Sequence, residues 1–464
     1  MSDPRAADPR LVAYELLRAV DERAAYANLL LPTLIARAGL DARDAALATE
    51  LGYGALRASG VLDEIIAACA NRPVAEVQPE VRDLLRLGGY QLLRTRIPAH
   101  AAVATTVDLA RATGNGRAAG FVNAVLRRLS RDSWDGWADK LAGDGGPLRR
   151  MALRTGHPEW IAAAFAAALG DDSDGELAQT EAALAAGDTR PSTHLAVSPG
   201  LADRDAVLAE IRRASPAEPG PWSPHAVRLT GGDPARVAAV RDGRARVQDE
   251  GSQLVALAVA RAPMDGRDER WLDLAAGPGG KAALLAALAG PRGAALTANE
   301  PNRSRAELVR QVTARWGTQV LVRDARELAA ARAGEFDRVL LDAPCSGLGA
   351  LRRRPEARWR RGPDDVAQLA DLQRELLAAA LRLVRPGGLV VYATCSPHPA
   401  ETTEIVAGAV ESGARAVDAR PAFRGVPGLG DGPWVQLWPH RHGTDAMFCA
   451  ILRRPGTLHA GGAV

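Results

Sequence analysis

Two patterns of apolar residues divide the chain into a helical front part and a part where strands and helices alternate. From about residue 9 to 130, apolar positions recur at helical spacing, with breaks such as Ile97-Pro98 and Gly114-Asn115-Gly116. From about residue 247, short apolar runs alternate with helical stretches, as in a doubly wound parallel sheet. The sequence therefore predicts an all-helical domain followed by an α/β domain.

The same pattern gives approximate elements and boundaries. Strands are expected at 271–274, 294–297, 320–322, 339–341, 389–393 and 447–452. Helices should fill the gaps, notably 303–315 and 366–384. A strand at 193–197 and a helix at 205–213 predict a small α+β cap before this sheet. The predicted domains are a helical domain, a helical linker, the cap and the α/β domain, at 5–132, 133–190, 191–235 and 236–456.

Composition sets the class of protein but says little about partners. The 464 residues predict two or three domains, and 47% apolar with 24% charged residues is ordinary for a soluble protein. No apolar run approaches the roughly 20 residues that cross a bilayer, and the first residues do not resemble a secretory signal. Four scattered cysteines form neither a disulfide framework nor a zinc pattern, so we expect a cytoplasmic protein. The net charge of +3 proves no nucleic-acid partner.

Two predicted strands end in a cysteine, and this pair is the candidate active site. Val339-Leu340-Leu341 runs into Asp342-Ala343-Pro344-Cys345, and a second apolar strand runs into Thr394-Cys395-Ser396. In a parallel α/β sheet, ligands sit beyond the carboxyl ends of the strands. A buried core cysteine is the ordinary fate of a free thiol, and it suits Cys69 and Cys449. It does not suit cysteines flanked by proline and serine at strand ends.

A glycine loop after the strand at 271–274 predicts a nucleotide site. A helix follows Gly277-Pro278-Gly279-Gly280-Lys281. The free N–H groups at the start of this helix can bind a ligand, and the glycines of the loop let the ligand approach the backbone. Lys281 stands out because the chain has only two lysines. Glu300 follows the next strand, where a carboxylate accepts ribose hydroxyls, and Asp324 follows the third. NAD and S-adenosylmethionine both fit this geometry, so the loop does not choose between them.

Two thiols and a carboxylate facing a nucleoside cofactor fit methylation of carbon 5 of cytosine. Carbon 5 becomes nucleophilic when a thiolate adds to carbon 6, and the adduct then needs groups for proton removal and release. Asp342, Cys345 and Cys395 supply the three groups that this scheme requires.

These motifs resemble those of the Sun/Fmu (RsmB-type) RNA cytosine carbon-5 methyltransferases over nearly the whole chain. Residues 247–253 and 442–445 match further, and 47–57 and 120–128 resemble helices of a NusB-like RNA-binding domain. The family usually has Cys-Ala-Ala-Pro-Gly-Gly-Lys where this chain has Ala275-Ala276-Gly277-Pro278 and continues to Lys281. The resemblance to the bacterial enzymes implies 16S ribosomal RNA as the substrate and S-adenosylmethionine as the cofactor.

The resemblance also implies roles for individual residues. Cys395 would be the nucleophile, Cys345 would assist breakdown of the adduct, and Asp342 and Lys281 would lie where cofactor and base meet. The implied cofactor-binding residues are Ala275, Ala276, Gly277, Pro278, Gly279, Gly280, Lys281, Glu300, Arg305, Asp324 and Asp342. DNA cytosine methyltransferases instead use the cysteine of a Pro-Cys loop, which would be Cys345. The second strand-end cysteine favours the RNA family.

Further expectations concern the partners. Six arginines around Trp359, within residues 351–361, are expected to contact RNA phosphates and a stacked base, although a solvated charged face is the simpler interpretation. His440 and His442 lack further ligands, so no metal is assigned. We expect a monomer that binds RNA and no membrane. A transfer-RNA methyltransferase and a non-catalytic RNA-binding assembly factor are the alternatives.

Overall fold

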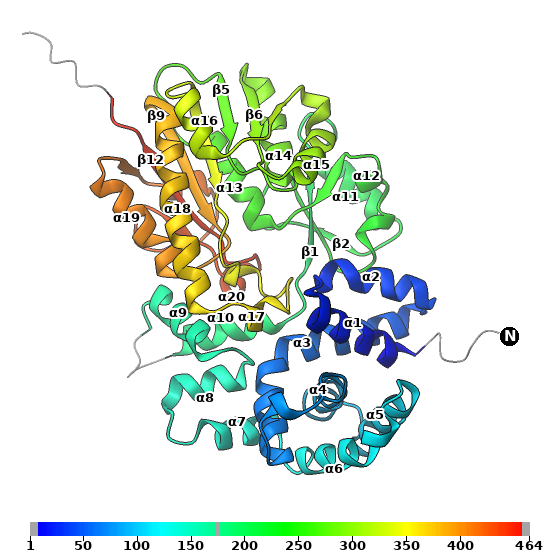
Figure 1. The fold of residues 1–464 in the computed structure, drawn as a ribbon. Coiled ribbons are helices and arrows are strands. Elements are labelled where there is room, and N and C mark those ends of the chain that lie inside the picture. The colour runs from blue at the N-terminus through cyan, green and yellow to red at the C-terminus, as the bar shows by residue number, and fades with distance from the viewer. Residues whose placement is uncertain (1–7, 172–176, 457–464) are drawn as a thin grey trace, which may run out of the picture. The chain divides into compact units, whose positions relative to one another are not determined.

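The computed structural model describes residues 8–171 and 177–456, which fall into two compact units (Figure 1). One unit is Met1–Arg190 with Leu351–Gly362, and the other is Pro191–Ala350 with Pro363–Val464. The chain therefore leaves the second unit after Ala350, adds the segment 351–362 to the first, and returns at Pro363. In the part of the chain that the structure describes, no helix has the length and apolar character needed to span a membrane.

The first unit, called the helical unit below, contains helices around one apolar core. Its helices are α1 (Pro9–Arg23), α2 (Ala27–Ala38), α3 (Ala42–Ala70), α4 (Pro79–Arg94), α5 (Ala99–Ala112), α6 (Ala119–Leu129), α7 (Trp134–Ala142), α8 (Gly146–Arg154), α9 (Glu159–Leu169), α10 (Ala178–Asp188) and α17 (Ala357–Arg360). Asp8 and Asp41 cap α1 and α3 through their side chains, which accept from backbone N–H groups. Leu16, Leu51 and Leu62 are fully buried in the core. The helical front part predicted from the sequence is confirmed.

The second unit begins with a small antiparallel sheet. Its strands follow the order β2-β3-β1-β4. The elements are β1 (Thr193–Val197), α11 (Arg204–Arg212), β2 (Ala217–Pro219), β3 (Ala226–Leu229), α12 (Ala238–Arg241) and β4 (Ala245–Val247). Leu195, Val207 and Val227 pack together between this sheet and α11. The predicted α+β cap is present, while the domain boundaries drawn from the sequence stay predictions.

A larger mixed sheet forms the rest of this unit, in the strand order β10-β12-β9-β8-β5-β6-β7, with β11 paired to β12. The strands are β5 (Arg270–Asp273), β6 (Ala295–Asn299), β7 (Gln319–Leu321), β8 (Phe336–Asp342), β9 (Val384–Thr394), β10 (Arg415–Val417), β11 (Val435–Gln436) and β12 (Phe448–Arg453). The strands from β9 to β7 pair in parallel, and β12 adds to β9 antiparallel. This is the predicted Rossmann-like α/β fold.

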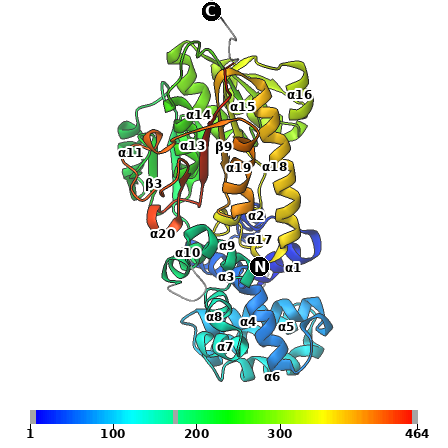
Figure 2. The same ribbon diagram turned by 90° about the vertical axis from the view of Figure 1, so that its left-hand side faces the viewer.

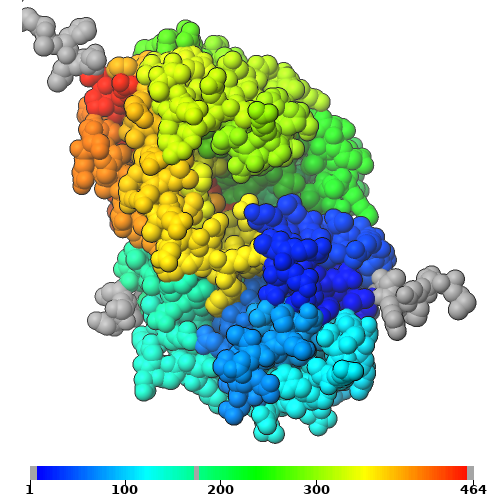
Figure 3. Space-filling model, viewed as in Figure 1, coloured from blue at the N-terminus to red at the C-terminus, as the bar shows by residue number. Residues whose placement is uncertain are grey.

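Helices cover both faces of this sheet (Figure 2). Successive residues of β8 point to opposite faces: Leu340 packs in one core with residues of α13 (Glu250–Arg261) and α14 (Gly280–Ala289). Val339 and Leu341 pack in the other core. That core includes residues of α16 (Ala325–Ala331), α18 (Pro363–Leu383) and α19 (Thr403–Glu411), and α16 and α18 lie on the surface seen in Figure 3. The remaining helices are α15 (Arg303–Thr313) and α20 (Pro439–His442).

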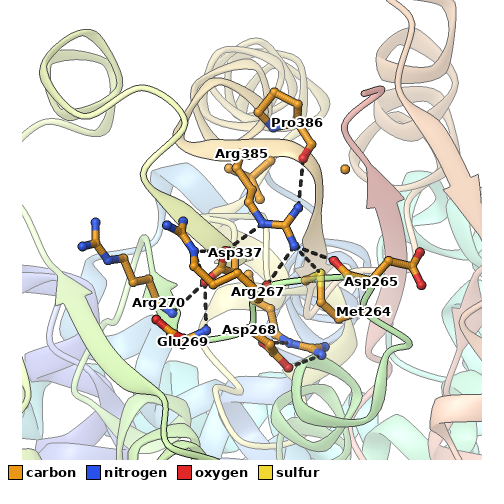
Figure 4. A network of polar contacts seen from close by, with 12 residues as sticks. Met264, Asp265, Arg267, Asp268, Glu269, Arg270, Asp337, Arg385 and Pro386 are labelled. Carbon is orange, nitrogen blue, oxygen red and sulfur yellow. Dashed lines mark hydrogen bonds and ion pairs between the residues drawn. The ribbon is translucent and has the colours of Figure 1, made fainter. Parts of the chain in front are cut away.

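A polar network ties the amino ends of β5, β8 and β9 together (Figure 4). Asp337, at the start of β8, is fully buried and accepts from the Nε atoms of Arg267 and Arg385 at 2.9 and 2.8 Å. It also accepts from the backbone N–H groups of Glu269 and Arg270, both at 2.9 Å. Burial alone would raise the pKa of Asp337, but these donors hold it below its usual range. Every oxygen of this carboxylate is used for structure.

Candidate active site

The opposite edge of the sheet carries the glycine loop between β5 and α14. Gly277 and Gly279 have φ angles of +57° and +96°, which other residues rarely adopt. A Cβ atom on Gly279 would lie 2.4 Å from Cγ2 of Val312, so a side chain at this position would collide with the residue that the loop packs against. The family usually has alanine at the position of Gly277, and the positive φ angle there favours the glycine of this chain. The loop forms a cradle that a nucleoside cofactor can approach closely.

The predicted ribose-binding residue Glu300 lies against this loop. Its side chain is almost fully buried, and Oε2 accepts from the Gly277 N–H at 3.0 Å. Oε1 accepts from Asn302 N at 3.0 Å and pairs with Nη2 of Arg305 at 2.8 Å. Arg305 is more than half exposed, so its side chain is free to leave Glu300 when a ligand hydroxyl takes its place. Glu300 and Arg305, which were both predicted, are thus brought to the loop.

Asp324 follows β7 and begins α16. Its carboxylate caps the helix by accepting from Arg326 N at 2.8 Å, and it also pairs with the Arg326 side chain. The Arg326 guanidinium is the main reason that the pKa of Asp324 falls to about 2, against the smaller effect of burial. Asn299, at the end of β6, donates to the carbonyls of Leu274 and Arg323 at 3.1 and 3.0 Å. Asn299 thereby joins the ends of three neighbouring strands, a role that the sequence did not reveal.

A second residue missed from the sequence is Asp273, the last residue of β5. It is fully buried, and neither carboxyl oxygen makes a hydrogen bond of good geometry within the described residues. Burial, and then the charge of Asp342, raise the pKa of Asp273 to about 7, although Lys281 and the nearby Ala275 amide act against this. A buried carboxyl group without a partner is costly, so it marks a place where a ligand group can bind.

Lys281 and Asp342 form an ion pair at the ends of α14 and β8. Nζ of Lys281 lies 2.8 Å from Oδ2 of Asp342, and the lysine side chain is largely buried. Burial lowers the pKa of Lys281, but the charges of Asp342, Cys395 and Asp273 raise it above its usual value overall. Lys281, one of only two lysines in the chain, is therefore a fixed positive charge in the site.

The two strand-end cysteines meet beside this ion pair. Strands β8 and β9 are parallel neighbours, with Asp342 opposite Ala393, so the loops that follow them lie together. Sγ of Cys345 is 3.4 Å from Sγ of Cys395, and both residues are partly exposed. The Cys395 sulfur and burial raise the pKa of Cys345 well above its usual range, and Glu401 and Asp342 add to this. The structure therefore brings together Lys281, Asp342, Cys345 and Cys395, as predicted.

Part of the arginine-rich segment after Cys345 is buried and does not form the RNA face that its composition predicted. Arg358 is completely buried in the helical unit, where it donates to the carbonyls of Gly156 and Gly187 and pairs with Asp188. Burial is the main reason that its pKa falls to about 10. Nε1 of Trp359 donates to the Arg57 carbonyl at 2.7 Å.

The Trp359 ring also fills a space on helix α3. A Cβ atom on Gly60 would lie 2.2 Å from this ring. The prediction of RNA contact is therefore wrong for Arg358, which is fully buried, while Trp359 is partly buried against α3. Arg354, Arg360 and Arg361 are exposed, so RNA contact stays a prediction for them.

The histidines near the carboxyl terminus have structural partners. Nδ1 of His442 accepts from Trp438 N at 2.8 Å, and Nε2 lies 2.9 Å from the Pro427 carbonyl. Within residues 8–171 and 177–456, no cluster of three or more histidine, cysteine or acidic residues has the arrangement of a metal site.

The fold and the site define a class of protein: a Rossmann-like, S-adenosylmethionine-dependent methyltransferase. The family model of the 16S rRNA methyltransferase RsmB/F matches residues 260–453, and the NusB family model matches residues 7–131. The chain is a member of the RsmB/F family of ribosomal RNA methyltransferases and carries an amino-terminal NusB domain.

Similar proteins support this placement over the full length. The chain is 56% identical to a putative methyltransferase of Mycobacterium tuberculosis (strain ATCC 25618 / H37Rv) over 97% of both chains. It is 33% identical to the probable ribosomal RNA small subunit methyltransferase B of Bacillus subtilis (strain 168), over 96% of this chain and 99% of the other.

Two solved structures share the fold. The crystal structure of PH0851 covers 98% of this chain and 100% of its own with a TM-score of 0.78 at 22% identity. NSun6 from Pyrococcus horikoshii, solved with SFG, covers 64% of this chain and 98% of its own with a TM-score of 0.53 at 18% identity.

Proposed function

We propose that this protein methylates carbon 5 of a specific cytidine in 16S ribosomal RNA through a covalent bond between Cys395 and carbon 6. The observation that carries this proposal is the pair of sulfur atoms 3.4 Å apart, next to the Lys281–Asp342 ion pair. A methyltransferase that acts on a nitrogen or on a hydroxyl group needs no thiol. Methylation of an unactivated ring carbon needs a nucleophile that first adds to the ring.

The residues at the carboxyl edge fit S-adenosylmethionine. At Gly277 the space beside the backbone is open, so a ligand can come close to the loop, and the carboxyl group of Asp273 can receive a donor from it. In this proposal the cofactor is held by Ala275, Ala276, Gly277, Pro278, Gly279, Gly280, Lys281, Glu300, Arg305, Asp324 and Asp342. When bound, S-adenosylmethionine supplies the methyl group.

Each remaining step belongs to the residues of the site. Cys395 adds as a thiolate to carbon 6 and makes carbon 5 nucleophilic, next to the ion pair of Lys281 and Asp342. Asp342 orients the pyrimidine edge while it holds Lys281. After methylation, a base, either water or a side chain of the site, takes the proton from carbon 5. The electron pair of that C–H bond restores the carbon 5–carbon 6 double bond, and the carbon 6–sulfur bond breaks with its electron pair going to Cys395. Cys345, in contact with the departing sulfur, assists this release.

The helical unit is proposed to contact the RNA outside the active site. A hollow of about 640 Å³ between α5 and α6 carries positive side chains that can meet phosphates. Its polar lining is His100, Asp108, Arg111, Asn123, Arg127, Ser130 and Arg131. The target base has to leave its stack to reach the cysteines, so a loop or single-stranded region is the expected substrate.

Methyl transfer to defined RNAs tests the proposal. The full-length protein is incubated with S-adenosylmethionine and either unmodified 16S ribosomal RNA or unmodified transfer RNA. Bisulfite sequencing and nucleoside mass spectrometry then locate the product. We expect 5-methylcytidine at one position of the ribosomal RNA. Methylation of transfer RNA alone would favour the alternative substrate, and absence of cofactor binding in calorimetry would favour a non-catalytic assembly factor.

A further inference from the structure

A buried carboxylate lies behind the two cysteines, and the mechanism above does not use it. Glu401 ends a short 3-10 turn, Pro399–Glu401, and is completely buried. Its Oε1 accepts from the Ser346 N–H at 2.7 Å, and Oε2 accepts from the Ser346 hydroxyl. Ser346 directly follows Cys345. The Glu401 carboxylate therefore holds both the backbone N–H and the hydroxyl of the residue next to a proposed catalytic thiol.

This hold extends to both cysteine loops. Gln373, on α18, donates from Nε2 to Oε1 of Glu401 at 3.1 Å and to the Pro344 carbonyl at 2.8 Å. Cys345 thus sits between two anchored neighbours, Pro344 and Ser346. Oγ of Ser346 is also 3.2 Å from Oγ of Ser396, which follows Cys395. The contacts of Glu401 consequently reach the loop of each cysteine within one or two hydrogen bonds.

The turn that carries Glu401 is itself fixed to the sheet. The hydroxyl of Tyr392, on β9, donates to the Glu401 carbonyl at 2.7 Å and lies 3.1 Å from Oε1 of Gln373. Gln373, Tyr392, Ser346 and Glu401 are all buried, so water does not compete for these bonds. A buried carboxylate is retained at a high desolvation cost, which here is offset by several directed donors.

The charges around the two thiols are not symmetric. The Cys395 sulfur and burial are the largest causes of the raised pKa of Cys345, and the carboxylates of Glu401 and Asp342 raise it further, whereas the ammonium of Lys281 interacts with Cys395. Burial is the first cause of the raised pKa of Tyr392, so its hydroxyl stays neutral. The groups that face the thiol pair are thus Lys281, Asp342, Tyr392 and Glu401. The negative charges of Glu401 and Asp342 disfavour a thiolate at Cys345.

We propose that Glu401 is a positioning residue that fixes the two cysteine loops and adds a negative charge that disfavours the thiolate of Cys345. This inference rests on the proposed function for its meaning in catalysis, but the geometry and charge that it describes exist without RNA or cofactor. Glu401 contacts neither substrate, and it acts through Ser346 and Gln373.

Replacement of Glu401 by Gln separates charge from position. The amide oxygen can keep the bonds to Ser346 N and Gln373, and the amide nitrogen can donate to the Ser346 hydroxyl, so the loop stays in place. The negative charge is lost. Glu404→Gln is the matched control, because it is the same change on an exposed glutamate three residues further on.

The charge is tested by alkylation of the full-length protein with iodoacetamide across pH, read for each cysteine by mass spectrometry. Both Glu variants are made in a Cys395→Ser background, so that Cys345 is followed alone. We expect Glu401→Gln to move the midpoint for Cys345 to lower pH by on the order of one unit, the usual size of such an effect. Glu404→Gln should leave it in place. An unchanged midpoint in Glu401→Gln would overturn the electrostatic role.

The position is tested by capture of the cysteine pair with phenylarsine oxide, which needs two adjacent sulfur atoms. Wild type and Glu401→Gln should bind one arsenical at similar rates, and Glu401→Ala should be slower by at least about tenfold, as for a lost orienting contact. Ser346→Ala removes one bond to Glu401 and serves if Glu401→Ala does not fold. Wild-type capture in the folded variants would overturn the positioning role. Neither assay uses RNA or methyl donor, so their outcome is independent of the proposed reaction.

Discussion

Strand β8 carries an aspartate near each end, and the two lie in opposite surroundings. Asp337, near the amino end, accepts two guanidinium and two backbone N–H hydrogen bonds. Asp342, at the carboxyl end, is partly exposed and pairs with Lys281 beside two thiols, and its neighbour Asp273 has no partner among the described residues. The amino edge satisfies its buried aspartate, whereas the carboxyl edge leaves the buried carboxyl group of Asp273 without a hydrogen bond among the described residues.

The comparison shows how one sheet separates stability from chemistry. Donors from the chain lower the pKa of Asp337, while burial and a like charge raise that of Asp273. Both aspartates are inaccessible to solvent, but Asp273 lies deeper in the protein, and burial is the first cause of its raised pKa. Asp337 also has four donors from the chain that Asp273 lacks, and a buried carboxyl group without such donors marks the functional edge.

The largest expected effect belongs to the carboxyl edge. Cys395→Ala should reduce methyl transfer by on the order of 10³-fold or more, as expected when a nucleophile is removed. Its unfolding temperature should stay close to that of the wild type, since the side chain is partly exposed. Initial rates with tritiated S-adenosylmethionine measure the first effect, and calorimetry the second. Full activity of this variant would remove Cys395 from the role of nucleophile.

The next effect belongs to the amino edge and concerns stability. Asp337→Ala leaves two arginines and two N–H groups without their acceptor and should cost about 3 kcal/mol of unfolding free energy. Methyl transfer per folded molecule should be unchanged. Because the pKa of Asp337 is lowered by folding, its stabilisation is present at neutral pH and is lost as the pH falls through that lowered value. Urea unfolding measures this, with the exposed Asp371→Ala as a control.

Asp273→Asn should raise the free energy of unfolding of the ligand-free protein, whereas Asp337→Ala lowers it. A carboxyl group whose pKa rises to about 7 on folding destabilises the ligand-free protein increasingly as the pH rises. The variant should therefore be more stable than wild type, by a margin that grows on the order of 2 kcal/mol between pH 5 and 8. Denaturant unfolding at both pH values measures the margin. A margin independent of pH would mean that Asp273 is ionised at low cost in the folded protein, which would contradict the contrast between Asp273 and Asp337.

The smallest effect concerns a thiol inside the core. Cys449 is fully buried on β12, and burial raises its pKa to about 12. Cys449→Ala should cost about 1 kcal/mol in packing and leave methyl transfer per folded molecule unchanged. Mass spectrometry of the native protein should show this thiol protected from alkylation while Cys395 reacts. Loss of activity without unfolding would extend the functional site beyond the strand ends.

Most of the architecture could be predicted because apolar periodicity is local. The helical front part, the cap and the central parallel strands follow from it, and so does the meeting of Cys345 and Cys395 at neighbouring strand ends. The short strands β2, β3, β4, β10 and β11 were not predicted, since two to four residues carry little periodicity.

The remaining features depend on contacts between distant residues. Glu401 and Gln373 reach the Cys345 loop from 55 and 29 positions away, so no local sequence signal points to them. Asp273 offered a local signal, an acidic residue at a strand end before a glycine loop. Arg358 was misread because a run of arginines looks the same whether it faces solvent or enters the core of the helical unit.

The central claim, that two thiols divide a covalent reaction between them, is tested most directly by trapping the adduct. Full-length Cys345→Ala, incubated with 16S ribosomal RNA and S-adenosylmethionine, should accumulate a protein–RNA complex that survives denaturing electrophoresis. Mass spectrometry should place the bond on Cys395, and the Cys345→Ala/Cys395→Ala double variant should form no complex. A complex that persists in the double variant, or one joined through a different residue, would contradict the account.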